Sequence, residues 1–323
     1  MTRFGKKKDG SRLTLLIKLT FSLLILALIF YWVILSSRII NGHHESNALI
    51  IREKKSTKRT YIKELPAGDN LIKRYNYSPP AYERASDPIN CGSAPSYENF
   101  FALDHLDRSR YNEDKKIYER FFAKHLGDDN FAGTYIELGA FNGAKESNTR
   151  FYDSCLGWDG LLIEGNPSMF EKVLQNRPNA HRLSYAPSCT SEGETVDFFD
   201  VQLTNAGIPG HALDFKNNKK IQVPCGPLGP VLEKMFPGGR IDFFSLDVEG
   251  AEMLVLNTID FDKIRVDVFM IEVENSMCTK EDENCEVRNL VRQKMEVHGY
   301  KRKLSVVRMS DVYVHPDSPY VNE

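Results

Sequence analysis

The sequence predicts an α/β domain built on a largely parallel sheet with helices on both faces. From about residue 134 onward, short β-rich runs alternate with helical segments, which is typical of parallel strands joined by helical crossovers. Two stretches stand out at the ends of expected strands. Tyr-Ile-Glu-Leu-Gly-Ala-Phe-Asn-Gly at 135–143 has a β-rich run with one acid and then two glycines, and Asp-Val-Glu-Gly-Ala-Glu at 247–252 follows another strand with acids and a glycine. Because the carboxyl ends of parallel strands share one edge, where ligands bind, we expect these two segments to meet there.

Each expected element has its own local signal. The expected strands are β-rich runs at 134–138, 160–164, 181–186, 195–199, 241–247 and 266–272, followed by an antiparallel pair at 301–307 and 311–315. The expected helices have apolar residues at helical spacing over 111–126, from the glycine turn to about 155, and over 167–176, 251–257 and 287–298. Pro167 suits a first helical turn, and Gly127 and Gly299 suit helix ends. Residues 201–239 are rich in glycine, proline and asparagine and predict a long loop.

The composition argues against a nucleic-acid partner. The 323 residues are 41% hydrophobic and 27% charged, with a formal net charge of -2. This balance is ordinary for a globular protein and gives no long-range attraction to a polyanion. No basic stripe with interleaved aromatic residues appears, so no nucleic acid is expected to bind.

The amino terminus predicts one membrane span. Residues 13–35 are almost wholly apolar, and a spanning helix needs roughly 17–25 such residues. The preceding tail, residues 1–12, is basic, so the positive-inside rule places it in the cytosol. A cleavable signal peptide is the alternative, but its apolar core runs to only about 7–15 residues. We therefore predict an uncleaved signal anchor, held in the lipid bilayer, of a type II membrane protein.

The rest of the chain is predicted to lie in the lumen. Residues 36–95 show little periodicity and carry basic pairs, prolines and glycine, which predicts a flexible stem. Residues 96–323 then form the lumenal domain. This topology fits the endoplasmic reticulum and Golgi, and also an endosomal or plasma-membrane protein, and the sequence does not choose among these compartments.

Cysteine usage fits an oxidising compartment. The six cysteines allow three disulfides, and about fifteen pairings are open. Cys278 and Cys285 bracket a short acidic loop and are the pair that we predict to be bridged locally. No Cys-x-x-Cys pair with a nearby histidine is present, so zinc is disfavoured. Glu272 and Glu274 are expected only to end a strand, and no residue is predicted to bind a metal.

The first glycine turn suits a nucleoside cofactor without a pyrophosphate. A dinucleotide turn has Gly-x-Gly-x-x-Gly, whereas this one reads Glu137-x-Gly139-x-x-x-Gly143 and lacks the central glycine. Glu164 ends the next expected strand, where a carboxylate can accept hydrogen bonds from two ribose hydroxyls. These features predict an S-adenosylmethionine site. Trp158 is expected to pack beside this strand or to help enclose an adenine.

Three blocks resemble the FkbM methyltransferase family. They are Tyr-Ile-Glu-Leu-Gly-Ala at 135–140, Leu-Ile-Glu-Gly-Asn-Pro at 162–167 and Phe-Ser-Leu-Asp-Val-Glu-Gly-Ala-Glu at 244–252, within a similarity over about 134–314. The resemblance implies a Rossmann-like class I methyltransferase with a mostly parallel seven-stranded sheet and a C-terminal antiparallel strand. It also implies methyl transfer from S-adenosyl-L-methionine to a hydroxyl oxygen of a glycan or small molecule. The cofactor-binding residues that we assign are Glu137, Gly139, Gly143, Glu164 and Asn166.

The acids at 247–252 are candidate catalytic groups. Methyl transfer depends mainly on the positions of donor and acceptor, and a hydroxyl acceptor benefits from a base within hydrogen-bond reach. We expect Asp247 and Glu249 to act here, with Asp247 orienting the acceptor or the methionine end of the cofactor. Acids that stabilise a helix start are the alternative for Glu249 and Glu252. His211 is a further candidate base in a covering loop, with a solvated histidine as its alternative.

A second resemblance implies a different function. The anchor, the stem, the FkbM-like domain and the ending Ser-Asp-Val-Tyr-Val at 310–314 are together similar to the animal proteins related to the insect protein Star. That group is implicated in carrying membrane-bound growth-factor precursors from endoplasmic reticulum to Golgi, with no methyl transfer assigned. The alternative function is therefore non-catalytic binding of a membrane-protein cargo during vesicle-mediated transport.

Overall fold

The computed structural model describes residues 61–323 except 87, 126–131, 214–218, 276–277, 280 and 283–284. The predicted cytosolic tail, the predicted span at 13–35 and the first part of the predicted stem lie outside the described residues. Among the residues that are described, no helix combines the length and the apolar character needed to cross a bilayer.

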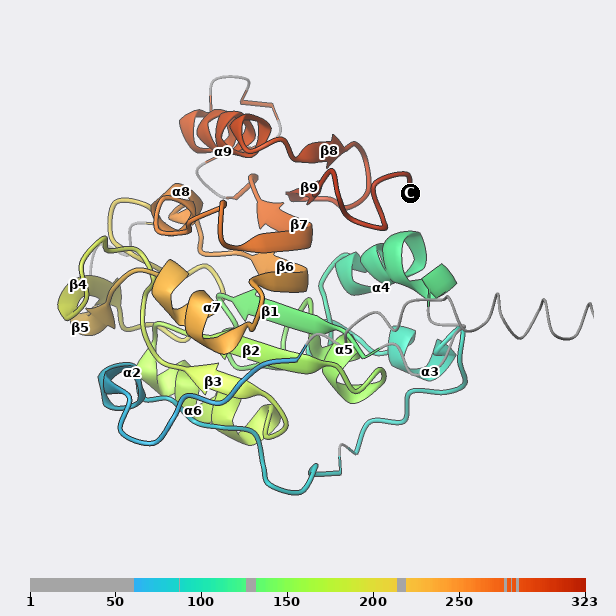
Figure 1. Cartoon of the computed structure of the whole chain (residues 1–323), viewed down its shortest axis with the longest axis horizontal. Coiled ribbons are helices and arrows are strands. Elements are labelled where there is room, and N and C mark those ends of the chain that lie inside the picture. The colour runs from blue at the N-terminus through green and yellow to red at the C-terminus, as the bar shows by residue number, and fades with distance from the viewer. Residues whose placement is uncertain are drawn as a thin grey trace, which may run out of the picture. The chain divides into compact units, whose positions relative to one another are not determined.

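A seven-stranded sheet forms the centre of the domain (Figure 1), with the strand order β3-β2-β1-β6-β7-β9-β8. The strands are β1 (Thr134–Leu138), β2 (Asp159–Ile163), β3 (His181–Leu183), β6 (Arg240–Leu246), β7 (Arg265–Glu272), β8 (Lys301–Lys303) and β9 (Ser310–Val314). Parallel pairing joins β3, β2, β1, β6 and β7, and β9 runs antiparallel to its neighbours β7 and β8. The predicted α/β class, parallel sheet and terminal antiparallel pair are confirmed.

Helices cover both faces of this sheet (Figure 1). They are α2 (Asn70–Arg74), α3 (Glu98–Phe101), α4 (Glu113–Ile117), α5 (Arg150–Ser154), α6 (Pro167–Asn176), α7 (Gly229–Met235), α8 (Glu252–Leu256) and α9 (Glu286–Val297). One apolar core lies against α7, α8 and α9, and a second, aromatic-rich core lies against α4, α5 and α6. Phe244 of β6 belongs to the first core and its neighbour Phe243 to the second, because successive side chains of a strand point to opposite faces.

Several expected elements differ from the structure. The helix expected from the glycine turn to about 155 is only α5, and the strands expected at 181–186 and 301–307 end at Leu183 and Lys303. The helix expected over 111–126 is α4 followed by a π-helical turn, Tyr118–Phe122, and a 3-10 turn, Ala123–His125. The strand expected at 195–199 lies outside the main sheet, in β4 (Glu194–Phe199), which pairs antiparallel with β5 (Lys220–Cys225). The prediction of a long loop over 201–239 is wrong at β5 and α7. The prolines of these elements suggested irregular structure, but Pro224 lies in a strand of a two-stranded sheet and Pro230 in a first helical turn, where proline is tolerated.

The compact domain begins before residue 96. Ile62, Leu65, Leu71 and Tyr75 are buried in the first core, and the compact unit that contains them extends over Arg59–Glu323. The backbone N–H of Lys63 also donates to a carbonyl of α7 at 2.7 Å. The prediction of a flexible stem is therefore wrong for these residues. Ile62 and Leu65 lie in an extended segment, and Leu71 lies in the short helix α2. Neither element is long enough to show a helical or strand period, so the sequence of this region resembles a linker.

Three disulfides join all six cysteines. They are Cys91–Cys155, Cys189–Cys225 and Cys278–Cys285, at sequence separations of 64, 36 and 7 residues. The predicted local bridge is confirmed. The second bridge ties β5 to the segment that follows β3, and thereby fixes the small β4–β5 sheet to the main domain. The two long-range pairs depend on the tertiary fold, which explains why spacing alone left them open.

Candidate functional site

Two adjoining cavities lie at the carboxyl edge of the central strands. The first has mainly apolar walls, including Met169, Phe198 and Ile208, and we call it the apolar cavity. The second has mainly polar walls, and we call it the polar cavity. Residues common to both are Gly139, Phe141, Leu203, Thr204, Asp247 and Glu249. The two glycine- and acid-containing segments therefore meet at one edge, as predicted from their strand ends.

The turn after β1 is held by the ends of two neighbouring strands. Gly139 has φ +86°, and a Cβ there would lie 1.7 Å from the backbone oxygen of Asp247. The N–H groups of Gly139 and Ala140 both donate to the carbonyl of Ile163, at 3.1 and 3.2 Å. Asp247 in turn donates its N–H to Leu138 at 3.0 Å. Only glycine permits this approach of β6 to the turn, because its positive φ and its missing Cβ are both needed.

Gly143 closes the same turn from the other side. Its N–H donates to the carbonyl of Ala140 at 2.8 Å, and its φ is +78°. A Cβ at this position would lie 2.9 Å from Cγ of Arg177 at the end of α6. Gly143 lines neither cavity and lies where the turn packs against the end of α6.

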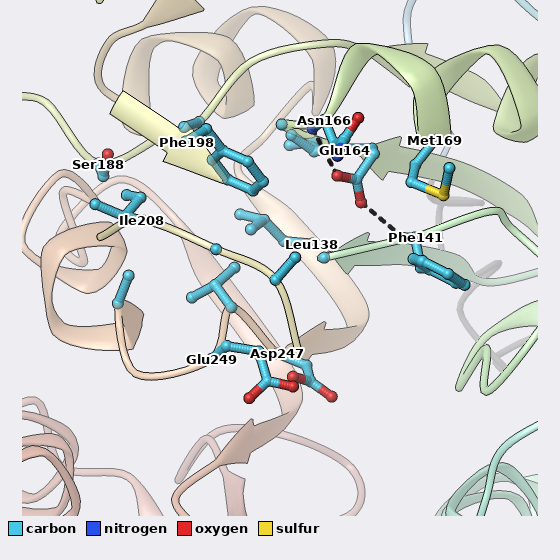
Figure 2. A pocket seen from close by; sticks show the side chains of 18 of the residues that line it. Leu138, Phe141, Glu164, Asn166, Met169, Ser188, Phe198, Ile208, Asp247 and Glu249 are labelled. Atoms are coloured by element: carbon cyan, nitrogen blue, oxygen red, sulfur yellow. Dashed lines mark hydrogen bonds between the residues drawn. The ribbon is translucent and has the colours of Figure 1, made fainter. Parts of the chain in front are cut away.

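Glu164 lies at the carboxyl end of β2, at one end of the apolar cavity (Figure 2). It is 7% exposed, and its two carboxylate oxygens accept from the backbone N–H groups of Phe141 and Asn166, both at 2.7 Å. Burial raises the pKa of Glu164 to about 7, against the opposing effect of these backbone donors. Further donors from a ligand in the cavity would favour the ionised carboxylate.

Asn166 has a structural task in addition to its place on the cavity wall. Its Oδ1 accepts from the N–H and the hydroxyl of Ser168, at 3.0 and 2.8 Å, and so caps the first turn of α6. Its Nδ2 donates to the carbonyl of Val201 at 3.1 Å. The side chain that we assigned to cofactor binding therefore joins α6 to the segment after β4.

Glu137 of β1 holds the loop that follows the glycine turn. Its Oε2 accepts from the hydroxyls of Ser147 and Thr149 at 2.8 and 2.7 Å. Its Oε1 accepts from the N–H of Asn148 at 2.7 Å. The side chain is 4% exposed and reaches the polar cavity, so any contact with a ligand comes from that side.

Arg177 connects these structures, although nothing in the sequence marks it as a site residue. The guanidinium is fully buried, with Nε donating to Asp153 at 2.8 Å and Nη2 to the hydroxyl of Tyr135 at 2.6 Å. Nη1 lies 3.5 Å from the carboxylate of Glu137 and also donates to the carbonyl of Gly143 at 3.3 Å. A single arginine at a helix end has no distinguishing pattern, so only the fold identifies this role.

Three carboxylates come together at the ends of β6 and β7. Leu246 pairs with Ile271 in the parallel register, so the next residues along the two strands, Asp247 and Glu272, emerge side by side. Glu249 follows in the turn before α8, with φ +56°. One oxygen of each of these three side chains lies within 4.8 Å of the others. Figure 2 shows the Asp247 and Glu249 carboxylates together, at the opposite end of the cavity from Glu164.

Burial raises the pKa of every member of this cluster, and repulsion from nearby carboxylates raises each one further. The pKa of Asp247 rises to about 6, mainly through burial. The pKa of Glu249 rises to about 9, through burial and then the neighbouring charge of Asp247. The pKa of Glu272 is also raised, for the same two reasons in the same order. Without a counter-charge, the three groups therefore share protons at neutral pH.

Other predicted candidates have structural positions. Glu252 accepts the N–H groups of Val248 and Gly250, both at 3.1 Å, at the start of α8, in agreement with the helix-start alternative. His211 lines neither cavity. Trp158 is fully buried beside β2, with its ring centroid 5.0 Å from that of Phe122, so the packing alternative is confirmed.

The strand order and the edge site define an α/β fold with a mostly parallel sheet and a ligand-sized site at its carboxyl edge. The chain belongs to the family of the methyltransferase FkbM domain, which it matches over residues 137–302, more than half of its length. The predicted FkbM membership is thereby confirmed.

Solved methyltransferase structures are similar to the chain at low identity. A TehB-like methyltransferase from Corynebacterium glutamicum is 12% identical, with 63% of this chain and 87% of that chain covered and a TM-score of 0.31. A methyltransferase from Aquifex aeolicus is 10% identical, with 62% and 92% covered and a TM-score of 0.30. The mitomycin 7-O-methyltransferase MmcR is 10% identical, with 63% and 53% covered and a TM-score of 0.29. No curated protein matches the chain.

Proposed function

We propose that the protein is a membrane-anchored O-methyltransferase that uses S-adenosylmethionine to methylate a hydroxyl group of a glycan or small molecule. The observation that carries this proposal is the pair of adjoining cavities that share Asp247 and Glu249. One cavity has the apolar walls and the strand-end carboxylate that a nucleoside needs, and the other has the polar walls that a hydroxylated acceptor needs.

The apolar cavity fits the cofactor. Each oxygen of Glu164 accepts one backbone N–H and keeps a further lone pair for a ribose hydroxyl. Phe141, Met169 and Phe198 provide apolar contacts for an adenine, and Gly139 leaves the edge of β1 open to the ligand's methionine portion. The bound cofactor supplies a methyl group on a sulfonium, which passes to oxygen as the new O–C bond forms and the C–S bond breaks.

The chain's own contribution is to orient the acceptor and to receive its proton. Asp247 and Glu249 line both cavities, so a hydroxyl that reaches the shared wall meets these carboxylates first. A carboxylate in this place accepts the hydroxyl proton while the oxygen attacks. Placement supplies most of the remaining rate acceleration, because both partners are held in neighbouring cavities.

The proposed topology places this domain in the lumen of the endoplasmic reticulum or Golgi. The apolar segment at 13–35 and the basic tail before it support a type II anchor. Three disulfides with no free cysteine among the six support an oxidising compartment.

Calorimetric titration with S-adenosylmethionine tests the proposal. Wild-type protein should bind, and Glu164→Gln should weaken the affinity roughly 10- to 100-fold, since a hydrogen bond to a charged group contributes about 1.5–3 kcal/mol. Glu171→Gln is the matched control, because it removes an exposed carboxylate from α6 and should bind like the wild type. Folded wild-type protein that binds no S-adenosylmethionine would overturn the proposal and favour the cargo-binding alternative.

A further inference from the structure

The acidic cluster at the shared wall has the geometry of a cation site. Asp247, Glu249 and Glu272 each present one oxygen within 4.8 Å of the other two. Oxygens bound to one ion at about 2.0–2.6 Å lie roughly 3–5 Å apart, so the three groups can contact a single ion without a large movement of the chain. All three side chains line the polar cavity, which gives the ion an entry path.

An orphaned oxygen provides a second, independent observation. Glu272 is 9% exposed, and its Oε2 is buried without any hydrogen-bond partner. A buried carboxylate oxygen with no donor carries a desolvation cost that no hydrogen bond offsets. Because this side chain lines the polar cavity beside Asp247, a ligand bound there can supply the missing partner.

Among the described residues, no lysine or arginine forms a direct ion pair with the three carboxylates. The charge of Arg110 opposes the rise in the pKa of Glu249 that burial causes, but Arg110 does not contact the cluster. The cations that line the polar cavity are Arg110 and Lys145, and each of them lies 3.8 Å from a carboxylate oxygen of Glu146 instead. The negative charge at the strand ends therefore lacks a direct ion-pair partner, which a bound cation can provide.

The ligand set determines the kind of cation. Three carboxylates without sulfur or imidazole suit hard divalent ions, which keep some water and exchange it for ligand oxygens. We propose that Asp247, Glu249 and Glu272 bind one divalent cation of the Mg²⁺, Mn²⁺ or Ca²⁺ class at the wall between the two cavities. The cation then holds an acceptor through two adjacent oxygens, a part of the inference that rests on the proposed function.

The residues of this site are not recognisable from the sequence, for a physical reason. Asp247 and Glu272 end different strands and become neighbours only through the parallel register of β6 and β7.

A vicinal diol or a hydroxy acid would chelate such an ion, with one oxygen directed at the apolar cavity. The inferred acceptor class is therefore a glycan or polyol with adjacent oxygens.

Binding of Mn²⁺ to the full chain, without cofactor or acceptor, tests the site directly. Electron paramagnetic resonance of free Mn²⁺ should show one bound equivalent that excess Mg²⁺ or Ca²⁺ displaces. Glu272→Gln should weaken Mn²⁺ binding by at least about 10-fold, and Asp247→Asn should do the same. Glu274→Gln is the matched control, two residues further along the chain and outside the cluster, and it should bind Mn²⁺ like the wild type.

A second measurement covers variants with altered stability. Mn²⁺ should raise the unfolding temperature of the wild type and of Glu274→Gln, but not that of Glu272→Gln. The proposal would be overturned if the wild-type protein bound no Mn²⁺ at millimolar concentration, or if Glu272→Gln bound Mn²⁺ as tightly as the wild type. The three carboxyl groups would then be stabilised by sharing protons and not by a cation. Glu164→Gln should retain Mn²⁺ binding, so loss of the cation site and loss of the cofactor site are measured separately.

Discussion

Replacing Gly139 with alanine tests how the site is assembled. The backbone at Gly139 has φ +86°, where a Cβ costs about 1–2 kcal/mol. The new Cβ would also lie 1.7 Å from the carbonyl oxygen of Asp247, and this contact must open to at least 3.0 Å. Since both atoms are fixed to backbone, the ends of β1 and β6 have to separate. The hydrogen bond from Asp247 to Leu138, at 3.0 Å, is then lost, at a further cost of about 1 kcal/mol.

Gly238→Ala separates the two effects. Gly238 has the same φ of +86°, but a Cβ there would meet no atom within 4 Å. Urea unfolding of both variants should show a loss of about 1–2 kcal/mol for Gly238→Ala and of about 3 kcal/mol or more for Gly139→Ala. Equal losses in the two variants would refute the argument, because the close approach of Asp247 would then contribute nothing.

Two further predictions concern buried charged groups. Burial lowers the pKa of His181 to about 4 from an ordinary 6.5, so the unfolded chain binds its proton first and stability falls as pH decreases from about 6.5 to 4. Urea unfolding at pH 7 and pH 4.5 measures this loss, which should be about 2–3 kcal/mol smaller in His181→Gln than in the wild type. If the free energy of unfolding fell equally in both proteins, His181 would not be the group responsible. Arg177→Met should destabilise the protein by about 3–5 kcal/mol, because it removes the buried cation that Glu137 and Asp153 share. An Arg177→Met protein as stable as the wild type would show that those carboxylates are held by their other donors.

Local motifs predicted one half of the site well. Gly139 and Glu164 come directly after β-rich runs, and the rule that parallel strands end at a common edge predicts that the two residues lie close together. Both line the apolar cavity. Gly143 was assigned to the cofactor from the same turn, yet it packs against α6 and lines neither cavity. A glycine in a turn signals backbone geometry, and the sequence does not distinguish a close ligand from a close helix.

Residues that depend on long-range pairing were not predicted. Glu272 looked like the end of a strand, and its place beside Asp247 follows from the register of β6 with β7. Arg177 looked like an ordinary helix end, and its burial follows from the packing of α6 on the turn after β1. Phe198 became part of a cavity wall because β4 lies in a separate small sheet.

The sequence by itself determined the α/β class, the edge at which the site lies, the family and the local disulfide Cys278–Cys285. Each of these depends on patterns within a few residues, or on the shared edge of parallel strands. The tertiary structure alone decided the packing of residues 61–75, the two long-range disulfides and the cluster of three carboxylates. Those features depend on strand register and on contacts between distant segments, which are fixed only when the whole core packs.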